Sequence, residues 1–191
     1  MTFDIVLAGV GGQGVLSVAA VIASAAMDQG LEVKQAEVHG MAQRGGAVQA
    51  SLRLADHPIA SDMIANATAS LVLSMEPLES LRYLGLLKTD GAVISAMTPL
   101  RNIVDYPPLD DILDTIRRVP THLLIDADAL ARGAGAVRAT NMVMVGAASR
   151  LLPIAPAAIE RCIATRFAPK GQAVVDLNLT AYRAGRTAVS A

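Results

Sequence analysis

Close to its amino terminus the chain passes from an apolar run through a cluster of glycines into a long alanine-rich segment. Phe3–Ala8 is almost continuously apolar and rich in β-branched residues, which predicts a strand buried on both faces, as in a parallel sheet. The cluster GVGGQG follows at 9–14, and residues 15–30 predict an apolar helix that ends at Gly30. Apolar and polar residues then alternate over 31–38 and predict a second strand. This order predicts a right-handed βαβ unit, and so an α/β fold.

The rest of the chain continues to alternate between strands and helices. Further strands are predicted at 47–55, which is half exposed, and at 70–75, 92–96 and 121–126, with a short one at 101–106. Helices are predicted from Pro77, over 110–118, after Asp126, and at 141–152, 156–167 and 171–185. No repeat, low-complexity tract or linker interrupts this pattern. We therefore expect residues 1–191 to form one domain, a mostly parallel sheet flanked by helices with a helical C-terminal part.

Composition excludes several classes of protein. The chain carries 17 acidic and 16 basic residues, and this balance argues against a nucleic-acid partner, which needs a basic surface. Its apolar stretches are broken well short of the roughly 20 residues that a bilayer span requires, so no membrane segment is expected. The single cysteine, Cys162, permits no internal disulfide, cysteine zinc site or cysteine-ligated iron–sulfur cluster. The histidines lack ligand spacing, so we predict no metal site, and one unpaired thiol predicts a cytoplasmic protein.

The first glycine cluster fits a dinucleotide-binding pattern. Gly9, Gly11 and Gly14 match G-x-G-x-x-G between a strand and a helix, and Gly12 is an additional glycine. Such a turn exposes backbone amides at a helix N-terminus, where anions bind. Glu37 lies at the distance expected, about 20 residues further on, for an acid that binds a ribose hydroxyl. The alternative is that these glycines only form a tight turn and allow close packing.

A second glycine-rich segment follows the second predicted strand. Residues 39–46 read HGMAQRGG and place polar groups at the carboxyl end of that strand, where open α/β sheets bind ligands. The guanidinium of Arg44 is suited to a phosphate or carboxylate, and His39 is a candidate proton donor or acceptor. The alternative is that Arg44 and Glu37 are structural charges and that His39 caps a turn. Asp126 and Asp128 are predicted helix N-caps, with a position in the ligand crevice as the other option.

The combination of GVGGQG with EVHGMAQRGGAVQASLRL resembles the gamma-type subunits of the 2-oxoacid:ferredoxin oxidoreductase family. Within that family the chain is similar to the beta subunit of the indolepyruvate enzymes. The resemblance covers most of the chain. It is more specific than the glycine pattern alone, because two motifs occur together at the right separation.

The resemblance implies a Rossmann-like subunit of an enzyme that oxidatively decarboxylates a 2-oxoacid, giving an acyl-CoA, CO2 and reduced ferredoxin. It places thiamine diphosphate, magnesium and iron–sulfur clusters on a large partner subunit, with coenzyme A near this chain, which alone would be inactive. A ligand- or interface-lining role is implied for the motif residues, namely Gly9, Gly11, Gly12, Gln13, Gly14, Glu37, His39, Gly40, Met41, Gln43, Arg44, Gly45 and Gly46. The alternatives are a stand-alone NAD(P)-binding oxidoreductase and a non-catalytic assembly domain.

Overall fold

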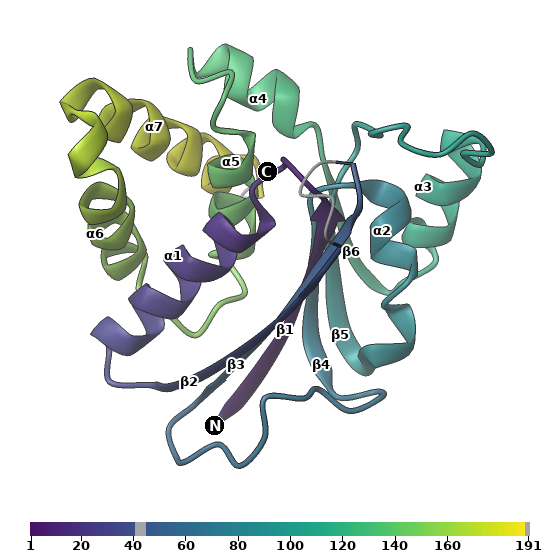
Figure 1. Cartoon of the computed structure of the whole chain (residues 1–191), viewed down its shortest axis with the longest axis horizontal. Helices are drawn as coiled ribbons and strands as arrows, with labels where there is room; N and C mark the ends of the chain where they lie inside the picture. Colours follow the sequence, from purple (N-terminus) through teal and green to yellow (C-terminus); the bar gives the residue numbers. More distant parts are fainter. Residues whose placement is uncertain (41–44, 190–191) are drawn as a thin grey trace.

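The sheet of the computed structural model has six strands in the order β2-β3-β1-β4-β5-β6 (Figure 1). The structure describes residues 1–40 and 45–189, with only the backbone of His39. The strands are β1 (Thr2–Val10), β2 (Glu32–His39), β3 (Ala47–Ala55), β4 (Ala69–Ser74), β5 (Leu87–Ala96) and β6 (Thr121–Ile125). Strands β1, β4, β5 and β6 pair in parallel, whereas β3 is antiparallel to both of its neighbours. The mostly parallel α/β fold expected from the sequence is thus confirmed.

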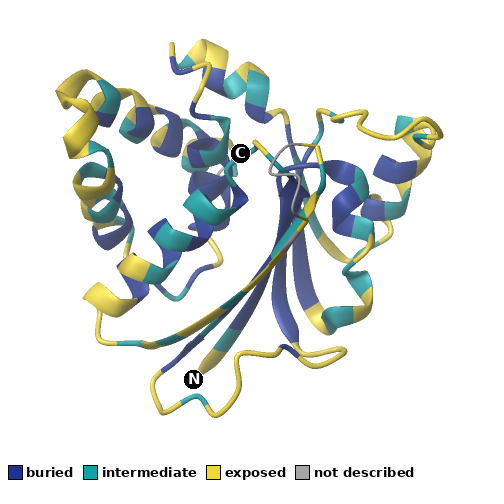
Figure 2. Ribbon diagram, in the orientation of Figure 1, coloured by how far each residue is buried: buried dark blue, intermediate teal, exposed yellow. Residues whose placement is uncertain are grey.

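Helices cover both faces of this sheet. They are α1 (Val15–Asp28), α2 (Pro77–Leu81), α3 (Leu109–Arg117), α4 (Ala127–Gly133), α5 (Thr140–Ala148), α6 (Pro156–Phe167) and α7 (Gln172–Ala188), with 3-10 turns at Leu84–Leu86 and Ala168–Lys170. Helices α1, α5, α6 and α7 lie on one side of the sheet, and α2 and α3 on the other (Figure 1). Buried residues gather between these layers in two clusters (Figure 2). No helix in the described part of the chain has the length and apolar character that a bilayer crossing needs.

Three details of the predicted fold are wrong. The predicted βαβ unit is split, because β3 lies between β1 and β2 instead of outside them. Residues 101–106, predicted as a short strand, form no strand; they belong to an irregular connection between β5 and α3. The helix predicted from Pro77 also ends early, at Leu81, and a longer β5 begins at Leu87.

The end of α1 is set by Gly30, as the sequence predicts. Gly30 has φ +79°, a left-handed conformation that a residue with a Cβ rarely adopts. The amide of Leu31 donates to the carbonyl of Ala26 (3.1 Å), and the amide of Gly30 donates to that of Met27 (3.0 Å). This pair of bonds satisfies the last carbonyls of the helix and turns the chain toward β2.

Helices α5 and α7 cross at two glycines. An ideal Cβ built on Gly146 would lie 2.0 Å from the carbonyl oxygen of Tyr182, and one on Gly185 would lie 1.9 Å from that of Val143. The two backbones are therefore in direct contact, with no room for a side chain between them. This crossing holds α5 against the C-terminal helix α7 (Figure 1).

An ion pair joins β1 to β3 near the edge of the sheet at which the parallel strands begin. Asp4 on β1 is 3% exposed and accepts two hydrogen bonds from Arg53 on β3, Nε to Oδ1 at 2.9 Å and Nη2 to Oδ2 at 3.1 Å. The remaining guanidinium nitrogen donates to the carbonyls of Ser61 and Met63 at 3.0 and 3.1 Å. Arg53 thus fixes the connection between β3 and β4 to the sheet.

Candidate functional site

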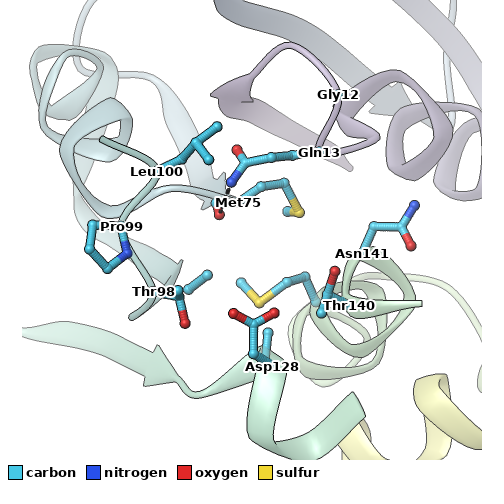
Figure 3. Close-up of a pocket in the computed structure, with 12 residues that line it drawn as sticks. Gly12, Gln13, Met75, Thr98, Pro99, Leu100, Asp128, Thr140 and Asn141 are labelled. Atoms are coloured by element: carbon cyan, nitrogen blue, oxygen red, sulfur yellow. Dashed lines mark hydrogen bonds between the residues drawn. The ribbon is translucent and has the colours of Figure 1, made fainter. Parts of the chain in front are cut away.

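A cavity opens at the carboxyl-terminal edge of the parallel strands. Helix α1 follows β1 on one face of the sheet and α2 follows β4 on the other face, so the chain diverges between these two neighbouring strands. Open α/β sheets bind ligands at such a switch point. The cavity measures about 300 Å³ and is lined by Gly12, Gln13, Met75, Ala96, Thr98, Pro99, Leu100, Ala127, Asp128, Thr140, Asn141 and Met144 (Figure 3).

The first glycine turn forms one wall of this cavity. Gly14 has φ +81° and precedes α1 in a left-handed conformation, and a Cβ there would lie 2.7 Å from Nδ2 of Asn141 on α5. The side chain of Gln13 folds back over the turn. Its Oε1 accepts from the amide of Val10 (2.8 Å), and its Nε2 donates to the carbonyl of Met75 (3.1 Å; Figure 3). Gln13 therefore joins the ends of β1 and β4.

Only some amides of the turn remain available to a ligand. The amide of Gly11 donates to the carbonyl of Gly46 (2.8 Å), and that of Gln13 donates to Val10 (3.0 Å). The amides of Gly12 and Gly14 make no hydrogen bond to the described residues of the chain. Helix α1 also begins without a side-chain cap. The turn thus offers fewer donors than its glycine content suggests, but the helix N-terminus is open.

Helix α5 presents a second open N-terminus to the same cavity. Its N-cap is Ala139, whose side chain accepts no hydrogen bond, and its first two residues, Thr140 and Asn141, line the cavity. By contrast, the N-terminus of α4 is capped by Asp126, which accepts from the amide of Ala129 at 2.8 Å. The uncapped N-terminus of α5 in the cavity wall, with that of α1 just beyond Gln13, favours the binding of an anionic group.

Asp126 and Asp128 have different roles, although the sequence offered a helix cap or a place in the ligand crevice for both. Asp126 is the helix cap, and Asp128 lines the cavity (Figure 3). An ionised carboxylate only accepts hydrogen bonds. Asp128 therefore favours a ligand that carries N–H or O–H groups in addition to its anionic group.

The opposite wall is the 97–108 loop, which connects β5 to α3. Thr98, Pro99 and Leu100 line the cavity. The loop is held by Glu76, a residue only 1% exposed, whose Oε1 accepts from the amide of Leu100 (3.3 Å) and from the hydroxyl of Tyr106. Burial and the neighbouring Glu76 carboxylate raise the pKa of Tyr106, so its hydroxyl remains a donor at neutral pH.

The described residues of the second glycine-rich segment lie beside the first turn and do not line the cavity. Gly45 and Gly46 form the backbone hydrogen bonds with Gly11, and Gly45 also accepts a bond from Asn102 (2.8 Å) in the 97–108 loop. Gly40 is exposed. Met41, Gln43 and Arg44 lie outside the described residues, as does the side chain of His39.

Glu37 does not occupy the position of a ribose-binding acid. It lies on the edge strand β2, and β3 separates this strand from β1 and its glycine turn. Its Oε1 accepts a hydrogen bond from Gln35 on the same strand. A dinucleotide site needs a ribose-binding acid at the end of a strand next to β1. Glu37 is not on such a strand, so the structure does not support the dinucleotide interpretation of the glycine pattern.

Several cavity residues were not singled out from the sequence. Thr98 follows a predicted strand, and its position at a strand end was the available signal. Thr140 and Asn141 carry no motif, because their place depends on how α5 packs against α1 and α7. In the described part of the chain, no group of three or more His, Cys, Asp or Glu residues is arranged to hold a metal ion.

An open α/β sheet with a cavity at its switch point defines a Rossmann-like fold. Comparison with known proteins gives the family. Residues 4–188 match the family described as pyruvate ferredoxin/flavodoxin oxidoreductase, and the chain belongs to this family.

Relatives of the chain are small subunits of such enzymes. It is 37% identical to indolepyruvate oxidoreductase subunit IorB of Archaeoglobus fulgidus, over 97% of this chain and 94% of that protein. The chain is 25% identical in sequence to pyruvate oxidoreductase subunit PORC from Thermotoga maritima. Its fold matches the crystal structure of that subunit with a TM-score of 0.74, covering 97% of this chain and 96% of that one.

A further solved structure shows the same fold within a larger chain. It is the 2-oxoglutarate:ferredoxin oxidoreductase from Magnetococcus marinus with 2-oxoglutarate, coenzyme A and succinyl-CoA bound. The TM-score is 0.79 at 23% identity, covering 99% of this chain but only 31% of that one. The fold described here therefore also occurs as one part of a longer oxidoreductase polypeptide.

Proposed function

We propose that the chain is the small subunit of a cytoplasmic indolepyruvate or arylpyruvate:ferredoxin oxidoreductase that forms an acyl-CoA and CO2. A large partner subunit carries the thiamine diphosphate, magnesium and iron–sulfur clusters, and this chain contributes binding and positioning. The IorB relative supports the substrate class. The single cysteine supports the placement of the clusters on the partner.

The role of the chain is to hold part of coenzyme A at the cavity. The observation that carries this assignment is the uncapped N-terminus of α5 in the cavity wall, with that of α1 just beyond Gln13 and the acceptor Asp128 in the same lining. Coenzyme A has both phosphate groups and amide N–H groups, and so matches both features. A cavity of about 300 Å³ accommodates only part of this long molecule, leaving its remainder at the mouth.

The whole assignment is tested by separating the subunits. The isolated chain is expected to show no turnover, while co-expression with the large subunit from the same genome gives 2-oxoacid-dependent and CoA-dependent reduction of ferredoxin. Micromolar binding of NAD(H) or NADP(H) by the isolated chain, with turnover of its own, would reject the assignment in favour of a stand-alone enzyme.

Asn141→Asp is expected to weaken the binding of coenzyme A by about tenfold without weakening the fold. The change is isosteric and adds a negative charge in the first turn of α5, where it favours the helix dipole but repels an anionic ligand. The measurement is the KM for coenzyme A of the complex, compared with the KM for the 2-oxoacid. Gln172→Glu makes the same amide-to-acid change in the first turn of α7 and is expected to alter neither constant. An increase confined to the 2-oxoacid would assign the cavity to that substrate instead.

The face around the cavity mouth is the proposed contact with the large subunit. Leu100, Ile103 and Val104 in the 97–108 loop are exposed, Val104 completely, and Val38 near the end of β2 is exposed at the same edge of the sheet. A cluster of exposed apolar side chains is typical of a protein interface. A ligand held in this cavity also has to reach the cofactors of the partner, so the two subunits must meet at this edge.

Val104→Asp is therefore expected to weaken association of the subunits by about tenfold. Its side chain is fully exposed, so the free chain should fold as before. The affinity is measured with purified subunits by titration calorimetry. Met63→Asp provides the matched control, because Met63 is 71% exposed in the connection at the opposite edge of the sheet. Equal losses in the two variants would contradict the proposed contact face.

A further inference from the structure

Four segments at the carboxyl-terminal edge are joined into a closed ring of hydrogen bonds. The first link is from Gln13 in the glycine turn to the carbonyl of Met75. The next residue, Glu76, accepts from the amide of Leu100 in the 97–108 loop. Two residues further on, Asn102 donates to the carbonyl of Gly45. The amide of Gly45 in turn donates to the carbonyl of Gly11 (3.3 Å), which closes the ring.

The ring unites elements that are distant in sequence. Its members come from the ends of β1, β4 and β5 and from the connection between β2 and β3. Gly12, Gln13, Met75 and Leu100 line the cavity, whereas Gly45 and Asn102 do not. Among the described residues, the second glycine-rich segment is linked to the cavity through its bonds to Gly11 and Asn102.

Glu76 is the strongest of these links. It is buried, and its carboxylate accepts from the amide of Glu79 (2.9 Å) in α2 as well as from Leu100 and Tyr106. Hydrogen bonds to an ionised acceptor in a buried site are stronger than neutral ones. Asn102 is the weakest link, because its side chain is exposed and makes one neutral hydrogen bond.

We propose that Asn102 and Glu76 are positioning residues that, through this ring, set the geometry of the Gly11–Gly14 turn at the cavity. The second glycine-rich segment acts on the cavity by the same route, although it contributes no residue to the described lining. Loss of the Asn102 link leaves the 97–108 loop and the second glycine-rich segment each held from one side only, and so loosens the turn to which that segment is bonded. The identity of the ligand as coenzyme A rests on the proposed function, whereas the coupling of the hydrogen-bonded loops to the Gly11–Gly14 turn does not.

Residue-resolved hydrogen exchange on the full free chain tests the coupling. Asn102→Ala is expected to raise exchange of the Val10 and Gln13 amides about tenfold, although Asn102 contacts neither residue. Tyr106→Phe removes one bond to Glu76 and is expected to raise exchange of the Gly45 amide, which Tyr106 does not contact. Gln172→Ala removes an exposed side-chain amide with one hydrogen bond to Asp176, and it should leave the exchange of all three backbone amides unchanged. Exchange that changes only at residues next to each substitution would overturn the proposal.

The assembled enzyme provides a second readout. At saturating partner subunit, Asn102→Ala is expected to raise the KM for coenzyme A about threefold while leaving kcat unchanged. A change in kcat with an unaltered KM would contradict a positioning role at the binding site. If the wild-type complex shows no dependence on coenzyme A, the proposed function fails, yet the exchange experiment still decides whether the ring couples the loops.

Discussion

Replacing Gly146 with alanine is expected to lower the free energy of unfolding by about 3 kcal/mol, near the upper end for an overpacked core. The added methyl group would lie 2.0 Å from a backbone oxygen of α7, which cannot rotate away as a side chain can. The two helices must therefore separate, and Tyr182, which is fully buried beside the crossing, loses contacts. Urea denaturation followed by circular dichroism measures the loss. Gly185→Ala should have a similar effect from the other side of the crossing.

Gly133→Ala is the control for this experiment. Gly133 is the last residue of α4 and has no atom within 4 Å of an ideal Cβ. Alanine there is expected to leave stability unchanged or to raise it by up to about 1 kcal/mol, because alanine is the better helix former. Equal urea midpoints of unfolding for Gly133→Ala and Gly146→Ala would show that the crossing of α5 and α7 tolerates a side chain.

Arg53→Met is expected to cost about 3 kcal/mol of stability, because it leaves Asp4 buried without its partner. The substitution also removes the two bonds to the carbonyls of Ser61 and Met63, so the connection between β3 and β4 should become more sensitive to proteolysis. Chemical denaturation gives the loss of stability, and limited proteolysis locates the loosened segment.

A double variant separates the unpaired charge from the lost packing. Asp4→Ala combined with Arg53→Met removes both charges and is expected to be more stable than Arg53→Met alone, since an unpaired buried carboxylate costs more than its absence. A double variant that is less stable than the single one would contradict this expectation, because it would mean that Asp4 stabilises the fold even without Arg53.

Local patterns in the sequence predict most elements of the fold but not their order in the sheet. The run Phe3–Ala8 and the glycine cluster that follows predict β1 and the start of α1, because burial and turn geometry act over a few residues. The insertion of β3 between β1 and β2 depends on pairing between distant segments, which no local pattern reports. Residues 101–106 have strand-like composition, but Glu76 and Asn102 hold them in an irregular loop.

The candidate site was predicted in part for the same reason. Gly12 and Gln13 line the cavity as the motif suggests, whereas Glu37 is too far away because β3 intervenes. The walls formed by Thr98–Leu100 and by Thr140 and Asn141 come from tertiary packing of segments without motifs. The roles of Met41, Gln43 and Arg44 remain predictions of the sequence, as does that of the His39 side chain.

The reversed direction of β3 determines where this scaffold can change in length. Because β2 and β3 are antiparallel neighbours, their connection is a hairpin, and no helix has to pack between them. Residues can be inserted into or deleted from a hairpin connection without repacking either helical layer. A change in this connection would be felt at Gly11 and Asn102, to which Gly45 is bonded, and so at the two loops that line the cavity.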